Sequence, residues 1–218
     1  MSMGVEAEKR LAGEAASELV HDEMLVGLGT GTTVAYLLEA IARRAPKAIF
    51  FASSPRTQVA ARALGLRVHG FGDVGRLDLA IDGADQIAPD GWLIKGGGGA
   101  LTREKIVAAA AQRFVVIADS TKVVDVLHAP VPLELARFGL AATLERLGSC
   151  EVRDSPRSPD GGVIADYYGP VAEPSELARR LSRTPGVVAH GLFEPELVSE
   201  LFVGDVATVR RTIIGGTK

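Results

Sequence analysis

Apolar residues in the first 130 positions gather in short runs, and longer segments of mixed polarity separate these runs. Short apolar runs bounded by glycine or polar residues predict buried strands at 24–29, 48–54, 67–71, 78–85, 92–97 and 114–120. Apolar positions at helical spacing predict helices at 5–21, 32–44, 57–65 and 101–113. Uniformly apolar strands that alternate with helices are typical of a parallel, doubly wound sheet.

After Pro130 the predicted elements follow a different order, strand-helix-strand-strand-helix-strand, at 131–136, 137–148, 150–154, 162–169, 174–182 and 186–193. This order is that of a split, ferredoxin-like unit. An apolar stretch at 201–211 predicts a last strand that returns to the first sheet. We therefore expect an α/β protein with a Rossmann-like parallel sheet, formed by residues 1–129 and 200–218. A smaller ferredoxin-like α+β domain is expected as an insertion at residues 130–199.

Composition narrows the classes of function. The net charge of −3 gives no support to a nucleic-acid partner, and the chain has no apolar run long enough to span a membrane. It also lacks the pattern of a signal peptide, so we expect a cytoplasmic protein. One cysteine, Cys150, excludes an internal disulfide and a cysteine-based zinc site. The histidines show no metal-ligand spacing, and we expect no metal at His21, His69, His128 or His190.

The glycines of VGLGTGTT, Gly27, Gly29 and Gly31, lie between a predicted strand and a predicted helix. A dinucleotide-binding GxGxxG would need glycine at position 32, or glycine or alanine at position 34. Thr32 and Val34 stand there, and the next strand ends without an acidic residue. The sequence thus argues against a nicotinamide cofactor at this loop.

What remains is a helix N-terminus flanked by threonine hydroxyls, which is a suitable site for one phosphate group. Lys122, after the strand predicted at 114–120, could supply a positive charge. The alternative is an ordinary strand–helix turn in which Thr32 or Thr33 caps the helix.

A second cluster of polar residues lies in DGADQIAPDGWLIKGGGGALTREK, residues 82–105. Asp82 and Asp85 follow a predicted strand, and Lys95 and the run Gly96–Gly99 precede a helix whose first turn contains Glu104. Loops at the carboxyl ends of parallel strands converge on one edge of the sheet. The same edge should carry the side chains that follow other strands, Ser53, Ser54, Asp119 and Lys122.

Carboxylates and a lysine around a glycine-lined pocket form an acid–base site that needs no metal. Each residue also has an ordinary structural explanation. Glu104 could belong to a solvated first turn, Asp82 could cap a turn, and Lys95 could be a surface lysine.

Taken together, these motifs identify a resemblance. The chain resembles ribose-5-phosphate isomerase of type A. The motifs that carry this resemblance occur in order along nearly the whole chain: GLGTGTT, DGAD, KGGGGALTREK, ADSTK, PVPLEL and TPGVVAHGLF. The resemblance implies interconversion of D-ribose 5-phosphate and D-ribulose 5-phosphate, a step of the non-oxidative pentose phosphate pathway. The reaction would proceed through a cis-enediol(ate) without a cofactor, and the protein would form a homodimer or homotetramer.

The resemblance also implies roles for individual residues. Glu104 matches the general base, Asp82 and Asp85 match the pair that handles sugar hydroxyls and proton traffic, and Lys95 matches a group that stabilises the enediolate. Lys9 matches a lysine near the phosphate. The implied substrate-binding residues are Thr30, Gly31, Thr32, Thr33, Asp82, Gly83, Ala84, Asp85, Lys95, Gly96, Gly97, Gly98 and Lys122.

Other functions remain open on the sequence alone. The same type of fold serves as a sugar-phosphate sensor without catalysis, although the chain shows no attached DNA-binding module and keeps Glu104. An amino-sugar phosphate deaminase should carry a histidine near its base, and none of the histidines is close to Glu104 in sequence. A CoA transferase is a further related enzyme, and a nicotinamide dehydrogenase is disfavoured by the glycine spacing.

Overall fold

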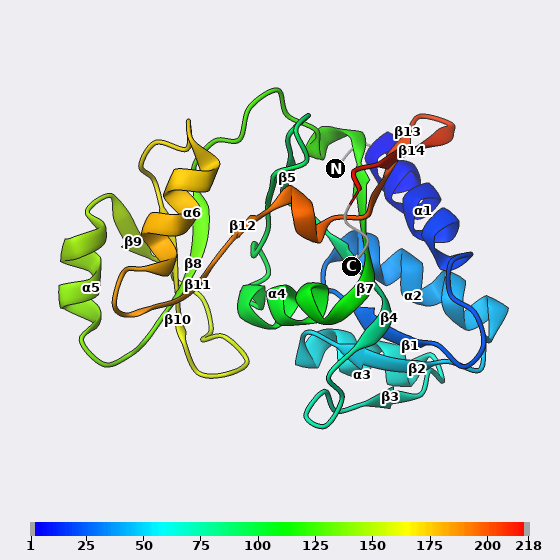
Figure 1. The fold of residues 1–218 in the computed structure, drawn as a ribbon. Helices are drawn as coiled ribbons and strands as arrows, with labels where there is room; N and C mark the ends of the chain where they lie inside the picture. Colours follow the sequence, from blue (N-terminus) through cyan, green and yellow to red (C-terminus); the bar gives the residue numbers. More distant parts are fainter. Residues whose placement is uncertain (1–2, 216–218) are drawn as a thin grey trace.

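The computed structural model describes residues 3–215 of the chain. The strands of its largest sheet are β1 (Leu25–Leu28), β2 (Ile49–Ala52), β3 (Val68–His69), β4 (Leu77–Gly83), β7 (Ala111–Asp119), β13 (Glu200–Asp205) and β14 (Thr208–Ile213). They lie in the order β14-β13-β7-β4-β1-β2-β3, and only β14 runs antiparallel to its neighbour (Figure 1). The six parallel strands have the order 3-2-1-4-5-6. The predicted doubly wound parallel sheet is therefore confirmed, although the sequence did not predict its strand order.

Helices cover both faces of this sheet. Helices α1 (Met3–Ser17), α2 (Thr32–Arg44) and α3 (Pro55–Ala63) share one core with Val26 and Leu28 of β1. Helix α4 (Leu101–Ala110) lies on the other face, where its Val107 packs with Phe114 of β7. Side chains of a strand alternate between the two faces, which explains this division. At Gly27, a Cβ would lie only 2.4 Å from Cγ1 of Val107, so glycine lets α4 pack closely on β1.

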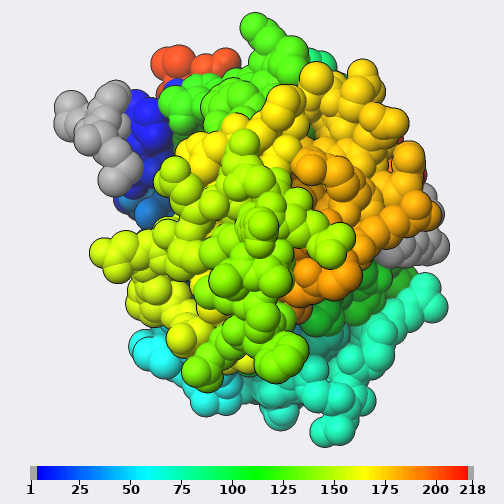
Figure 2. All heavy atoms as spheres, turned by 90° about the vertical axis from the view of Figure 1, so that its left-hand side faces the viewer, coloured from blue at the N-terminus to red at the C-terminus, as the bar shows by residue number. Residues whose placement is uncertain are grey.

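The expected ferredoxin-like unit is present (left side of Figure 1; facing the viewer in Figure 2). Its elements are β8 (Val131–Leu135), α5 (Leu140–Leu147), β9 (Cys150–Val152), β10 (Val163–Tyr167), α6 (Pro174–Ser182) and β11 (Val187–His190). All paired strands are antiparallel, in the order β11-β8-β10-β9. The domain boundaries at residues 130 and 199 stay predictions, and the ends of the predicted first domain, 1–2 and 216–218, lie outside the described residues.

The strand predicted at 186–193 is wrong as a single strand, because the chain changes sheet at Gly191. Beyond it, β12 (Leu192–Phe193) joins β6 (Leu93–Ile94) and β5 (Gln86–Ile87) in a small antiparallel sheet. The N–H of Gly191 donates to the Pro132 carbonyl (2.7 Å), and its carbonyl accepts from the N–H of Lys95 (2.8 Å). A Cβ on Gly191 would lie 2.2 Å from the Lys95 carbonyl oxygen, so the crossing requires glycine.

Two further predictions differ from the structure. The helix predicted at 101–113 ends at Ala110, because Ala111 and Arg113 already pair with β4 as part of β7. The tail predicted as one strand at 201–211 forms two, β13 and β14, with a turn that includes Val206 at φ 25°. The expected return to the first sheet is confirmed, because β13 pairs in parallel with β7. Short 3-10 helices follow β7 (η1, Ser120–Lys122) and β12 (η2, Pro195–Leu197).

Within residues 3–215, no helix has both the length and the apolar character that crossing a lipid bilayer requires.

Candidate active site

A cavity of about 460 Å³ opens at the carboxyl ends of β1 and β4, where the strand order of the large sheet reverses. Such a reversal is the usual ligand site of an open α/β sheet. The residues that line it are Lys9, Thr30, Gly31, Thr32, Thr33, Ser54, Pro55, Arg56, Gly83, Ala84, Asp85, Lys95, Gly96, Gly97, Gly98, Ala100, Glu104, Lys122, Arg157 and Pro159.

The loop after β1 leaves the first turn of α2 without a side-chain cap. Gly31 precedes the helix at φ +121°, a backbone conformation that favours glycine, and no cap hydrogen bond is formed there. The interpretation of Thr32 or Thr33 as the helix cap is therefore wrong. First-turn N–H groups have no partner within a helix, so this turn can bind an anionic group at the cavity wall.

Asp82, at the end of β4, holds this loop in place. Its Oδ1 accepts hydrogen bonds from the N–H groups of Thr30 (3.0 Å) and Gly83 (2.7 Å). A Cβ at Gly29 would lie 1.7 Å from the same oxygen, so only glycine allows this approach. The carboxylate of Asp82 is thus directed at protein groups, and Asp82 does not line the cavity.

The ammonium group of Lys95 lies between two buried carboxylates. Its Nζ is 2.7 Å from Oδ2 of Asp82 and 3.1 Å from Oε2 of Glu104, and it donates to the Gly83 carbonyl at 2.6 Å. All three charged residues are buried: Lys95 is 2% exposed, Asp82 is 3% exposed and Glu104 is 4% exposed. The interpretations of Lys95 as a surface lysine and of Glu104 as part of a solvated turn are therefore wrong.

The position of Glu104 follows from the pattern of α4. Leu101, Glu104, Val107 and Ala108 are the buried residues of this helix, and their spacing places them on one face. The carboxylate thus occupies an apolar stripe that faces inward. The sequence alone does not show this stripe, because Ile106 of the same helix is also apolar and yet is 52% exposed.

Burial changes the proton affinity of this group. Removal from water raises the pKa of Glu104 and, although Lys95 opposes the rise, the pKa reaches about 7. Burial alone would lower the pKa of Lys95, but attraction to Asp82 and Glu104 outweighs it and raises that pKa above its ordinary value. Near neutral pH, Glu104 can both accept and return a proton while Lys95 stays charged.

The glycine loop after β6 forms another wall of the cavity. Gly96 has φ +103°, which favours glycine. The N–H of Gly97 donates to Oδ2 of Asp85 at 2.8 Å. A Cβ on Gly98 would lie 3.2 Å from Cγ2 of Thr30, so the glycine loop and the loop after β1 approach each other closely.

Basic side chains from separate elements line the same cavity, namely Lys9 from α1, Arg56 from α3, Lys122 from η1 and Arg157 from the β9–β10 loop. Lys9 is 5% exposed and forms an ion pair with Glu6 at 2.9 Å. Their charges favour a ligand that carries a phosphate group.

Most residues predicted from the sequence meet at this cavity. Every predicted substrate-binding residue except Asp82 lines it, and so do Glu104 and Lys9. Ser53 and Asp119, expected at the same edge, do not line it. Asp119 is fully buried and caps η1 through the N–H of Thr121 (3.1 Å), because its side chain turns back to its own chain. The catalytic and binding roles themselves stay predictions.

The sequence reading missed Pro55, Arg56, Ala100, Arg157 and Pro159. Arg56 could have been found, because it follows β2 and so belongs to the same edge of the sheet. Arg157 and Pro159 come from the inserted unit, and no local pattern places that loop over the cavity.

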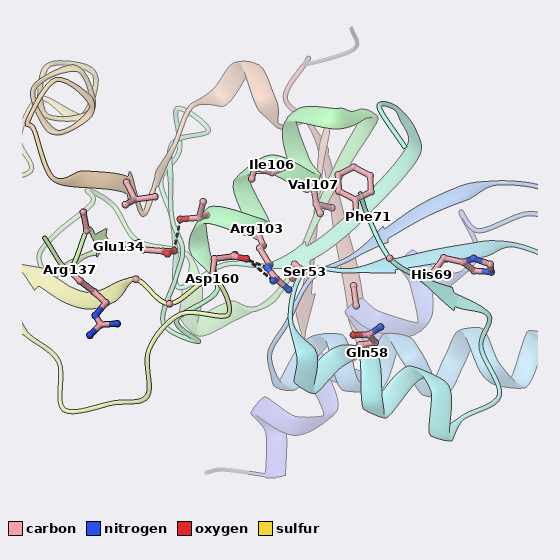
Figure 3. A pocket seen from close by; sticks show the side chains of 17 residues that line it. Ser53, Gln58, His69, Phe71, Arg103, Ile106, Val107, Glu134, Arg137 and Asp160 are labelled. Atoms are coloured by element: carbon pink, nitrogen blue, oxygen red, sulfur yellow. Dashed lines mark hydrogen bonds and ion pairs between the residues drawn. The ribbon is translucent and has the colours of Figure 1, made fainter. Parts of the chain in front are cut away.

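A larger cavity of about 780 Å³ lies on the other side of the first turn of α4 (Figure 3). Ser53 and Phe71 line it, as do Arg103, whose guanidinium forms two 2.7 Å bonds to Asp160, and Glu134, which accepts from Thr102 at 2.6 Å. Neither Glu104 nor Lys95 lines this space. The acid–base groups therefore belong to the smaller cavity.

Within residues 3–215, no group of three or more His, Cys, Asp or Glu side chains is arranged to hold a metal ion. Two histidines contact protein groups instead: His190 lies 3.0 Å from the Ser182 hydroxyl, and His128 lies 3.3 Å from Nε2 of Gln86.

Comparison with known proteins gives a consistent result. A family model described as ribose 5-phosphate isomerase A (phosphoriboisomerase A) matches residues 49–207. Ribose-5-phosphate isomerase A of Gluconobacter oxydans is 42% identical over 212 residues, which cover 89% of this chain and 91% of the relative. The protein of the same name from Haloarcula marismortui is 42% identical over 223 residues, which cover 95% of this chain and 96% of that relative.

Solved structures agree with this. Ribose 5-phosphate isomerase A from Neisseria gonorrhoeae superposes with a TM-score of 0.90 at 29% identity, over 95% of this chain and 96% of that one. A D-ribose-5-phosphate isomerase in complex with phospho-erythronic acid gives a TM-score of 0.91 at 30% identity, over 97% of this chain and 100% of that one.

Proposed function

The chain belongs to the ribose 5-phosphate isomerase A family, and we propose that it interconverts D-ribose 5-phosphate and D-ribulose 5-phosphate with Glu104 as the base. One observation carries the assignment of the base. Glu104 is a buried carboxylate with a pKa of about 7, and it lines the same cavity as Thr32 and Thr33. A base and a phosphate subsite in one cavity are what a phosphosugar isomerase needs.

In the open-chain aldose, Glu104 removes the proton from C2. The electron pair forms the C1–C2 double bond of a cis-enediolate, and the negative charge moves to O1. The proton then returns at C1, while a second proton moves from O2 to O1, which gives the ketose. General acid–base catalysis of this kind contributes about 10²–10⁴ in rate.

Lys95 supplies positive charge next to the reacting atoms. Its ammonium is already desolvated and fixed by Asp82, so it needs little rearrangement when negative charge develops on the substrate. Asp85 lines the cavity and is the carboxylate available to sugar hydroxyls. Asp82 contacts Lys95 and the loop after β1, which favours a supporting role over direct contact with the sugar.

The phosphate group of the substrate is assigned to the first turn of α2, with Lys9 and Lys122 as its positive partners. The N–H groups of a helix N-terminus and two ammonium groups suit a dianion. A relative of 30% identity was solved with phospho-erythronic acid, a phosphorylated acid whose planar carboxylate resembles the enediolate, which supports a phosphosugar site here.

The test is conversion of ribose 5-phosphate to the ketose in the presence of EDTA, with the wild type and Glu104→Gln side by side. We expect metal-independent turnover in the wild type and a loss of several orders of magnitude in the variant. Binding without turnover by the wild type would instead indicate a sugar-phosphate sensor. Unchanged turnover in Glu104→Gln would exclude Glu104 as the base.

A matched control is Glu134→Gln. Glu134 is also buried (2% exposed) but lines the neighbouring cavity. This variant should stay active, so that loss of activity in Glu104→Gln can be attributed to the position of the carboxylate.

We also propose a homodimer or homotetramer. Phe138, on the inserted unit, is 96% exposed, and a contact with a second copy would remove its apolar ring from water. Light scattering after size-exclusion chromatography should show a smaller species for Phe138→Asp. A cytoplasmic location remains part of the proposal, supported by the single cysteine, which cannot form a disulfide within the chain.

A further inference from the structure

Arg153, directly after β9, connects the inserted unit to the glycine loop of the site. Its Nη1 donates to the carbonyl oxygens of Gly97 (3.0 Å) and Gly96 (3.4 Å). Its Nε donates to Oδ2 of Asp166 at 2.8 Å, and its Nη2 donates to the other oxygen of the same carboxylate. The forked contact leaves the guanidinium little freedom to turn.

The contact with Gly97 has a consequence on the other side of the peptide group. In a trans peptide, the carbonyl of one residue and the N–H of the next point in opposite directions. A guanidinium on the Gly97 carbonyl therefore fixes the direction of the Gly98 N–H. Gly98 is exposed, lines the cavity and lies close to Thr30.

The N–H groups of Gly97 and Gly98 differ in availability. The Gly97 N–H is already donated to Asp85. Among the described residues, the Gly98 N–H has no hydrogen-bond partner in the protein. It therefore remains available to a ligand in the cavity.

We propose that Arg153 is a positioning residue for the isomerisation. Held by Asp166, it orients and polarises the Gly97–Gly98 peptide so that the Gly98 N–H is directed at the substrate oxygen that becomes negatively charged. The inserted unit thereby takes part in the reaction without touching the substrate.

The physical effect has two parts. A fixed peptide needs no reorganisation when the enediolate forms, and a donor of this kind is worth about 10²–10³ in rate. A positive charge on the carbonyl also makes the N–H of the same peptide a stronger donor, because hydrogen bonds in a chain polarise one another. Since Arg153 acts through another group, we expect its removal to lower kcat by about 10- to 100-fold.

This inference rests on the proposed function, and its test separates the two. The variants are Arg153→Met, which removes the charge, and Arg153→Lys, which keeps a charge but loses the fork. Arg113→Met is the control. Arg113 also forms an ion pair with a buried carboxylate, Glu200, and its side chain is 31% exposed against 23% for Arg153. It lies near the start of β7, at the edge of the sheet opposite the site.

The measurements are kcat, KM and inhibition by two anions, phospho-erythronic acid and inorganic phosphate. Phosphate needs only the phosphate subsite, whereas phospho-erythronic acid also places a planar anion where the enediolate forms. We expect Arg153→Met to lower kcat with KM changed less than about threefold. Its affinity for phospho-erythronic acid should fall about as much as kcat, with unchanged affinity for phosphate. Arg153→Lys should give an intermediate loss, and Arg113→Met should resemble the wild type in every measurement.

Thermal unfolding of each variant shows whether it is folded at the assay temperature. If Arg153→Met does not fold, the same measurements are made on Arg153→Lys, and rescue of Arg153→Ala by added guanidinium is tested. Equal weakening of both anions, or an unchanged kcat in folded variants, would overturn the positioning role. An inactive wild type would overturn the proposed function instead.

Discussion

The ammonium nitrogen of Lys95 lies 3.1 Å from Oε2 of Glu104, and both side chains are almost completely buried. The same ammonium also contacts Asp82, so the group of three contains two carboxylates and one positive charge. One positive charge shared by two carboxylates leaves Glu104 incompletely compensated, which together with burial accounts for its raised pKa. Several measurable properties depend on this arrangement.

The first concerns the pH dependence of activity. Because the base must be ionised, kcat/KM should rise with pH through an apparent pKa of about 7. Lys95 favours the ionised form of Glu104, so Lys95→Met should move the rising part of the pH–rate profile to higher pH. The same change should lower the maximal rate by about 10²–10³. A pH–rate profile measures both effects. A rise in kcat/KM centred near the ordinary pKa of glutamate would contradict the assignment of Glu104 as the base.

The second concerns stability against pH. The pKa of Glu104 is higher in the folded protein than the ordinary value of 4.5, so between these two pH values the folded state binds a proton that the unfolded state has released. Its contribution to stability is full below about pH 4.5 and is lost as the pH rises through about 7. The loss is at most roughly 3 kcal/mol. Urea unfolding at several pH values should show that Glu104→Gln gains stability relative to the wild type as the pH rises, and a constant difference would contradict this.

The third concerns the contact between Gly29 and Asp82. In Gly29→Ala the new methyl would overlap the carboxylate, which must move and release the N–H of Thr30. We expect a loss of about 1–3 kcal/mol in stability together with reduced kcat/KM. Gly72→Ala is the control, because a Cβ there has no heavy atom within 4 Å. Similar behaviour of the two variants in unfolding and rate assays would show that the close approach is unimportant.

The fourth concerns the phosphate subsite. Lys122→Met should raise KM for ribose 5-phosphate about tenfold, because a charged hydrogen bond is worth about 1.5–3 kcal/mol. The value of kcat should change little, since the phosphate is equally charged in substrate and transition state. Lys47→Met, at an exposed position just before β2, is the control. A fall in kcat at unchanged KM would place Lys122 near the reacting carbons instead.

Much of the site could be predicted from local patterns. Apolar runs alternating with helices specify a parallel sheet, and every such strand brings its following loop to the same edge. That rule alone placed Thr32, Asp85 and Lys122 on one cavity although they come from three different loops. It placed Asp119 wrongly, because the direction of a single side chain depends on hydrogen bonds made after the strand ends.

The sequence by itself determined the order of the elements, the edge of the sheet that carries the polar residues, and Glu104 as the acid near a glycine loop. Only the tertiary structure decided that Lys95 lies between Glu104 and Asp82, that Gly191 carries the chain from one sheet to another, and that Arg153 reaches the Gly97 carbonyl from 56 positions away. Periodicity and turn propensity act between neighbours in the chain and can be read locally. Desolvation and charge pairing depend on groups that meet only when the chain is folded.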